Sequence, residues 1–116
     1  MISLTQLQVR VYETTKFLGY KVNKELTIKK LKQEIKELKK SKVQRNRNAP
    51  LVAANIKDNE KFVKFFDLYL KGTIHDEAPD IILVILSFYQ QQGFDSETDL
   101  MNKYRYNLYR KKKTKN

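Results

Sequence analysis

The sequence of 116 residues contains no cysteine, three glycines, two prolines and a single histidine. The absence of cysteine excludes a disulfide framework and any thiolate metal site. With so few turn-forming residues, and with 41% hydrophobic and 32% charged residues, the composition favours helices. A chain of this length can bury one hydrophobic core, so we expect one all-α domain over residues 1–110.

Long apolar stretches are also missing. The longest uninterrupted apolar run, Ile81–Leu86, is far shorter than the roughly 20 residues that a membrane span requires. The N-terminal sequence MISLTQLQVR lacks the apolar run of a signal peptide. We therefore expect a cytoplasmic protein without a membrane-spanning segment.

Positive charge is abundant, with a net charge of +11, but it is unevenly distributed. Two clusters contain no acid, and the rest of the chain is close to neutral. The clusters are Lys39, Lys40, Lys42, Arg45 and Arg47, and Arg110, Lys111, Lys112, Lys113 and Lys115. Such basic clusters are typical of proteins that bind nucleic acid. Like charges repel and bury nothing, so we expect residues 111–116 to form a disordered basic tail.

Apolar residues recur at helical spacing in five segments. These are about Leu4–Leu18, Ile28–Leu38, Phe62–Leu70, a helix of about 15 residues containing IILVILSFY, and Leu100–Leu108. Residues 41–57 show no clean period and are interpreted as a long, at most partly helical connection. We expect an antiparallel bundle of about five helices, with the IILVILSFY helix buried at its centre because it is apolar on every side.

Boundary signals support these helices. Ser3 with Gln6 has the spacing of a capping box at the first helix, and Ser96 has the same relation to Asp99 at the last. Gly72 is expected to end the third helix, and Gly93 is expected to end the fourth.

Two pairs of acids could carry chemistry. Glu34 and Glu37 are three residues apart on the second helix, and Glu34 borders its apolar stripe. Glu77 and Asp80 repeat this spacing at the start of the apolar helix. The alternatives are a solvated charged face for the first pair, and helix capping for the second.

Together the pairs predict four carboxylates converging from two helices, which would repel one another without a cation. Mg²⁺ fits, because it prefers oxygen ligands and commonly bridges protein carboxylates to phosphates. A di-iron site would need Glu-x-x-His pairs that the chain lacks. His75, the only histidine, is interpreted as a surface residue at a helix start.

A third feature lies near the C-terminus, where Lys103, Asn107 and Arg110 occur at i, i+4 and i+7 and so line one stripe. Lysine and arginine neutralise phosphate charge, and asparagine can orient a sugar or base. The alternative is a basic helix with half-buried tyrosines that runs into a solvated tail.

In combination, QEIKEL, HDEAPDIIL and KYRYNLYR resemble the motifs of the MazG-like nucleotide pyrophosphohydrolases, in the all-α NTP pyrophosphatase superfamily. The opening LTQLQVRVYETTKFLGY and the later KGTIHDEAPDIILVILSFYQQQGFD are also similar to that family. The resemblance implies Mg²⁺-dependent hydrolysis of a nucleoside triphosphate to the monophosphate and pyrophosphate, and a dimer or larger homo-oligomer. It implies that Glu34, Glu37, Glu77 and Asp80 hold the metal as catalytic residues, and that Lys103, Asn107 and Arg110 bind the nucleotide.

Three positions depart from the family pattern: Gln33 replaces a frequent acid, Lys36 a small residue, and Pro79 a helix-compatible one. Lys36 would either intrude on the site or point to solvent. Pro79 suits a helix that begins near Asp76, which would put it in the first turn. Two alternatives therefore stay open: a basic helical nucleic-acid-binding or assembly protein, and a catalytically decayed family member that still binds nucleotides.

Overall fold

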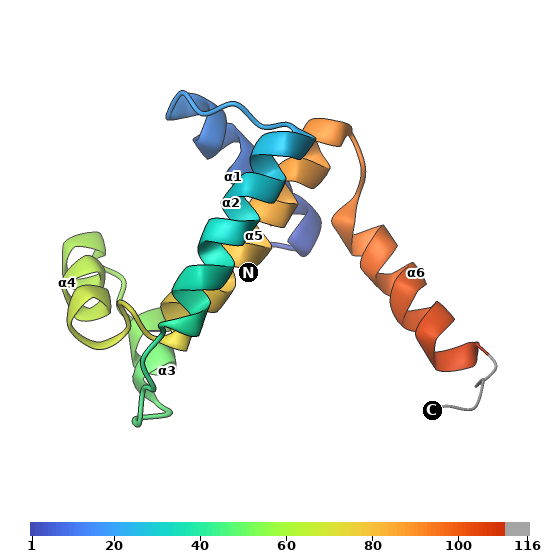
Figure 1. The fold of residues 1–116 in the computed structure, drawn as a ribbon. Helices are drawn as coiled ribbons and strands as arrows, with labels where there is room; N and C mark the ends of the chain where they lie inside the picture. The colour runs from blue at the N-terminus through green and yellow to red at the C-terminus, as the bar shows by residue number, and fades with distance from the viewer. Residues whose placement is uncertain (111–116) are drawn as a thin grey trace. The chain divides into compact units, whose positions relative to one another are not determined.

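The fold is described by a computed structural model, in which residues 1–110 are placed. Every regular element among these residues is a helix (Figure 1). The helices are α1 (Leu4–Phe17), α2 (Lys24–Lys39), α3 (Ala49–Ala54), α4 (Asn59–Tyr69), α5 (Ile74–Gln92) and α6 (Ser96–Tyr109). The all-α class is confirmed. There are six helices rather than about five, because the connection over residues 41–57 contains α3, where Pro50 has the backbone angle that a first helical turn needs.

The described chain divides into two compact units, and each is considered by itself. One unit is residues 24–85, which contain α2, α3, α4 and the first part of α5. The other combines residues 1–23 with those from Leu86 onward, and so contains α1, the end of α5 and α6. The single domain predicted over residues 1–110 stays a prediction, and the tail predicted over residues 111–116 lies outside the described residues.

The start of α1 confirms the predicted capping box. The Ser3 hydroxyl accepts a hydrogen bond from the Gln6 backbone N–H at 3.1 Å, and the Gln6 side-chain oxygen accepts one from the Ser3 N–H at 2.8 Å. Two backbone N–H groups that lack partners within the helix are thereby satisfied.

The capping box predicted at α6 is wrong. The N-cap is Asp95, whose carboxylate accepts a hydrogen bond from the Thr98 backbone N–H at 3.1 Å, and Ser96 is the first helical residue. An aspartate directly before a serine competes for the same free N–H groups, and its negative charge also interacts favourably with the helix dipole.

The turn before α5 brings this helix close to the segment that follows α2. Gly72 has φ of +77°, a conformation that costs glycine little and other residues much. Its carbonyl accepts a hydrogen bond from the Lys42 N–H at 2.8 Å, and Lys42 and Thr73 form an isolated parallel bridge. The buried Thr73 then accepts hydrogen bonds from the backbone N–H groups of His75 and Glu77 and so begins α5.

In the unit of residues 24–85, a small core forms where α3 meets α4. Its buried residues are Ala49, Ala53 and Leu70, and phenylalanines of α4 pack against them. Phe62 and Phe66 are partly buried against this core. Tyr69 is exposed instead, with its ring 4.6 Å from that of Phe65.

In the other unit, the buried polar side chain of Gln8 joins three helices. Gln8 of α1 donates to the Gln90 side chain of α5 at 3.0 Å and to the Phe94 carbonyl at 2.7 Å. The side-chain amide oxygen of Gln8 accepts a hydrogen bond from the Ser96 N–H, at the start of α6, at 2.9 Å. Gln8 is only 2% exposed, so these bonds replace the water that it loses on folding.

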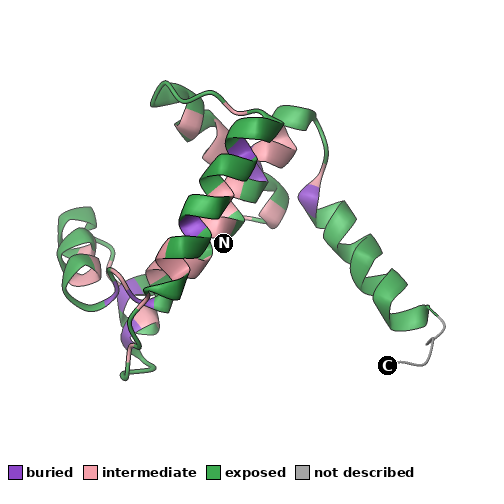
Figure 2. Ribbon diagram, in the orientation of Figure 1, coloured by how far each residue is buried: buried purple, intermediate pink, exposed green. Residues whose placement is uncertain are grey.

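The helix α5 is less buried than its sequence predicts. Leu86 and Ser87 are buried, whereas Ile82 is 56% exposed. Figure 2 shows that much of this helix is only partly buried or exposed. The prediction of a helix buried on every side is therefore wrong for the described residues, because a continuous apolar run shows what a helix can bury and not what covers it. Among residues 1–110, no helix is both long and apolar enough to cross a membrane.

Candidate metal centre

The first acid pair lies on α2. Leu31, Glu34 and Leu38 share one side of this helix, because they are three and four residues apart. Both leucines are half-buried, and Glu34, which lies on the same side of the helix, is only 4% exposed. Glu37 lies one turn further on and is half-buried. A carboxylate this deeply buried requires a partner.

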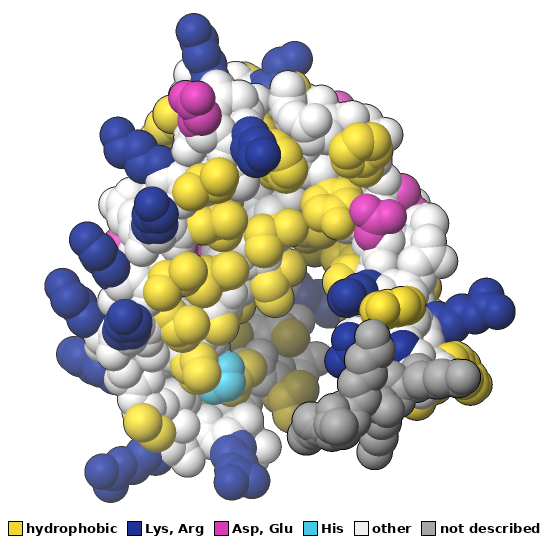
Figure 3. All heavy atoms as spheres, turned by 45° about the vertical axis from the view of Figure 1, so that its right-hand side comes forward, with side chains coloured by type: hydrophobic (Ala, Val, Ile, Leu, Met, Phe, Trp, Pro, Cys, Tyr) yellow, Lys and Arg dark blue, Asp and Glu magenta, His cyan; other side chains and the backbone are white. Residues whose placement is uncertain are grey.

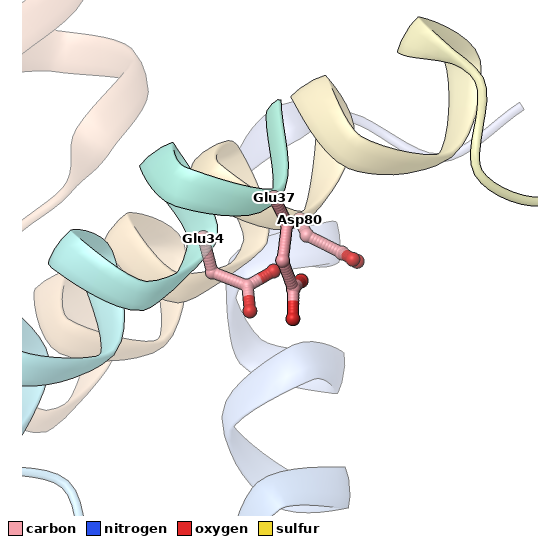
Figure 4. A group of neighbouring side chains, drawn as sticks. All are labelled: Glu34, Glu37 and Asp80. Atoms are coloured by element: carbon pink, nitrogen blue, oxygen red, sulfur yellow. The ribbon is translucent and has the colours of Figure 1, made fainter. Parts of the chain in front are cut away.

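Asp80, in the second turn of α5, meets this pair. Carboxylate oxygens of Glu34, Glu37 and Asp80 lie within 4.8 Å of one another. Figure 4 shows the three side chains pointing to a common region, two from α2 and one from α5. The buried Glu34 and the half-buried Asp80 thus come from different helices into one group of acids. Three carboxylates this close together repel one another, so the cluster is short of positive charge.

The pKa values reflect this shortage. Burial and the negative charge of Asp76 raise the pKa of Asp80, although its hydrogen bond to Glu34 opposes the rise. Loss of water, followed by the charges of Asp76 and Glu37, raises the pKa of Glu77. Within residues 1–110 the ion pair between Lys30 and Glu34, at 3.5 Å, is the one salt bridge, and it offsets a single charge. The remaining repulsion favours binding of a cation.

Glu77 is placed differently from the other predicted ligands. It does not share the group of Glu34 and Glu37, but it lies with Asp76 and Asp80 in a second group whose oxygens are also within 4.8 Å of one another. Asp80 thus belongs to both groups. Assignment of all four predicted acids to one metal site stays a prediction.

Asp76 is a further candidate ligand, which the two predicted acid pairs do not include. Its carboxylate accepts a hydrogen bond from the Gly72 N–H at 2.8 Å, so it also stabilises the turn before α5. The signal was its spacing of four residues from Asp80, which puts both side chains on one face of the helix.

The structure shows where the three residues that depart from the family pattern lie. Lys36 is exposed and lies about 200° around α2 from Glu34, so it points away from the acids. Gln33 is exposed as well. Pro79 is the sixth residue of α5 and not part of its first turn, because α5 begins at Ile74, before Asp76. Pro79 has no N–H for the carbonyl four residues earlier, which is that of His75.

The opposite face of α5 borders an open apolar cavity of about 550 Å³ between α3, α4 and α5. Its walls include Phe62, Phe66, Pro79 and Ile82, and none of the acids. His75, on the rim, is exposed near the helix start, as the sequence predicts. Figure 3 shows this histidine beside a group of apolar side chains. The cavity therefore offers no ligand to the acidic cluster.

The predicted nucleotide-binding stripe lies on α6, in the other unit. Lys103, Asn107 and Arg110 are all exposed, and Arg110 is the C-cap of the helix. The Tyr106 ring is 4.8 Å from the Lys103 ammonium and 5.8 Å from the Arg110 guanidinium. Two of the three predicted residues thus share one aromatic contact, and their role in nucleotide binding stays a prediction.

Comparisons with known proteins give no support for any family. No protein-family model matches the chain, and searches of curated proteins and of solved structures give no significant match. Membership of the MazG-like family accordingly stays a prediction that rests on the motifs alone.

Proposed function

We propose that this protein is a Mg²⁺-dependent nucleoside triphosphate pyrophosphohydrolase. The observation that carries the proposal is the convergence of Glu34, Glu37 and Asp80 from two helices onto one small region. The reaction itself is inferred from the resemblance of the motifs to the MazG-like family. A cytoplasmic location and self-association belong to the same proposal.

The donor set fits the proposed metal. Both acidic groups offer only carboxylate oxygens, which are the ligands that Mg²⁺ prefers, and neither includes a histidine. The chain has no cysteine that would favour a softer metal. When bound, Mg²⁺ would offset the carboxylate charge and hold the phosphate oxygens of the substrate.

The side chains would have distinct tasks. Glu34 is the most rigidly held ligand, because it is buried and paired with Lys30. Asp80 joins the two acidic groups and would orient the carboxylates of α5 relative to those of α2. Glu37 and Glu77, both half-buried, would complete the ligand set at the solvent side. By resemblance, Lys103 and Arg110 would bind phosphate oxygens, with Asn107 on the sugar or base.

The test is pyrophosphate release from a panel of ribo- and deoxyribonucleoside triphosphates, with and without Mg²⁺. We expect release only with the metal, and we expect Glu37→Gln and Asp80→Asn to abolish it. The matched control is Asp67→Asn, which changes an exposed acid of α4 outside both acidic groups.

Two outcomes would redirect the proposal. If the two acid variants hydrolyse as fast as the control, the acidic cluster is not the active site. If the wild type binds nucleotides in the presence of Mg²⁺ but releases no pyrophosphate, the catalytically decayed alternative is correct.

A further inference from the structure

The face of α2 that points away from the acids carries a row of lysines. Lys29, Lys32, Lys36 and Lys39 recur at intervals of three and four residues, and all four are exposed. At about 100° per residue, their side chains fall within a narrow sector of the helix. We call these four residues the lysine stripe.

The charge of the lysine stripe is not neutralised. Of the acids of α2, Glu34 and Glu37 belong to the acidic group on the other side of the helix, and Glu25, four residues before Lys29, forms no salt bridge with that lysine. Among the described residues the only ion pair is that of Lys30 with Glu34, which does not involve the stripe. Lysines three and four residues apart on a helix repel one another, so the stripe stabilises nothing within the unit.

The positive surface continues beyond the helix. Lys40, Lys42, Arg45 and Arg47 follow α2, all of them exposed, and the next acid in the sequence is Asp58. Figure 3 likewise shows many more basic than acidic side chains on the face of the molecule that it presents. The stripe is thus followed directly by an acid-free basic segment, residues 38–57.

We infer that the lysine stripe binds the phosphate backbone of double-stranded nucleic acid, without reading its sequence. From Lys29 to Lys39 the helix rises about 15 Å, a length that corresponds to about four phosphates of one strand. Lysine is a flexible point charge suited to such contacts, and it offers no fixed geometry for reading base edges.

The chemistry of α2 favours a duplex over other polyanions. Single-strand binding depends on aromatic side chains that stack on bases, and α2 has none. A membrane-surface helix needs a broad exposed apolar face. Leu31 and Leu38 are half-buried inside the unit, and the exposed apolar residues of α2 are three, Leu26 at 41% and Ile28 and Ile35 at 44%.

The test measures binding of the full-length protein to a fluorescent duplex of about 20 base pairs by anisotropy, in EDTA and without nucleotide. This setting separates the inference from the proposed hydrolysis. With four phosphate contacts, we expect affinity to fall roughly 100-fold between about 50 and about 200 mM salt. Two duplexes of unrelated sequence should bind equally well.

The deciding variant is Lys32→Glu with Lys36→Glu, which should weaken binding by at least about 10-fold and flatten the dependence of log K on log salt by about two units. Its matched control is Lys57→Glu with Lys64→Glu, which removes the same charge from exposed positions off the stripe. A second variant, Lys32→Gln with Lys36→Gln, keeps the test valid if charge reversal impairs folding.

Three results would overturn the inference. One is an equal loss of affinity in the stripe variant and its control, which would leave only a non-local charge effect. Another is tighter binding to a single strand than to a duplex, which would favour the tyrosine-bearing α6. The third is preferential binding to anionic phospholipid vesicles, which would identify a membrane as the partner.

Discussion

Replacement of Asp80 by asparagine tests the electrostatic basis of the metal centre. Asp80 is the residue common to both acidic groups, one of which contains the buried Glu34. Asparagine keeps the size and removes the charge. In metal-free buffer at neutral pH we therefore expect Asp80→Asn to be more stable than the wild type, although it should lose Mg²⁺-dependent pyrophosphate release.

The expected gain can be bounded from the geometry. Two unit charges 4.8 Å apart, the limit within which these oxygens lie, repel by about 1 kcal/mol in water and by about 3.5 kcal/mol at an effective dielectric constant of 20. Asp80 is half-buried, so solvent screens its interactions and the lower figure applies. We expect the free energy of unfolding to rise by about 1 kcal/mol, which raises the melting temperature by about 4 °C in a domain of this size.

The pH dependence has a defined sign. Burial, and then the charge of Asp76, raise the pKa of Asp80 above its ordinary value, so the folded protein binds this proton more tightly than the unfolded chain does. The wild type should therefore lose stability as the pH rises from the ordinary carboxyl range through the raised pKa. In acid, where Asp80 is protonated in both states, the advantage of Asp80→Asn should disappear.

The assay is chemical denaturation of both proteins in EDTA across this pH range, repeated with Mg²⁺. The wild type should gain more stability from Mg²⁺ than the variant, because only the folded wild type offers the full ligand set. A metal-free variant that is less stable than the wild type at neutral pH would refute the reasoning, because it would show that the Asp80 carboxylate is stabilising without a cation.

Three further predictions concern other parts of the chain. Gln8→Ala should lower the free energy of unfolding by about 2 to 4 kcal/mol, because three hydrogen bonds of a buried side chain are lost, whereas the exposed Gln91→Ala should leave denaturation curves nearly unchanged. Lys103→Ala should raise the KM for the nucleotide several-fold and leave Mg²⁺ binding by calorimetry intact; a loss of metal binding would contradict its assignment to the substrate. Deletion of residues 111–116 should leave the melting temperature nearly unchanged, and a drop of several degrees would show that the tail packs against the fold.

The helices and their local geometry could be predicted from the sequence, because helix formation depends on neighbours three and four residues away. The apolar period of α2 and the capping box of Ser3 with Gln6 are examples. The same spacing puts Glu34 and Glu37 on one side of α2. The N-cap of α6 was not predicted correctly, because the adjacent residues Asp95 and Ser96 are both good N-cap residues. The sequence pattern favoured Ser96, whereas the N-cap is Asp95.

Contacts between helices could not be predicted from the periodicity of apolar residues. Gln8 and Ser96 are distant in the sequence, and nothing in the pattern of α1 indicates that a glutamine there bonds to the start of α6. Likewise, an apolar run such as that of α5 does not indicate which side of the helix packs against other elements. Packing of separate elements decides these features, and a single sequence specifies packing only through the whole fold.

The acidic cluster depends both on local sequence and on the packing of separate helices. The sequence by itself determined that the chain is all-α, that its acids come in two pairs at i and i+3, and that no cysteine competes for a metal. Only the tertiary structure decided that Asp80 meets Glu34 and Glu37, and that Glu77 lies instead with Asp76. The physical reason is that a helix sets the direction of each side chain relative to its own axis, whereas the turn at Gly72 and the hydrogen bond from Lys42 place the start of α5 near the end of α2.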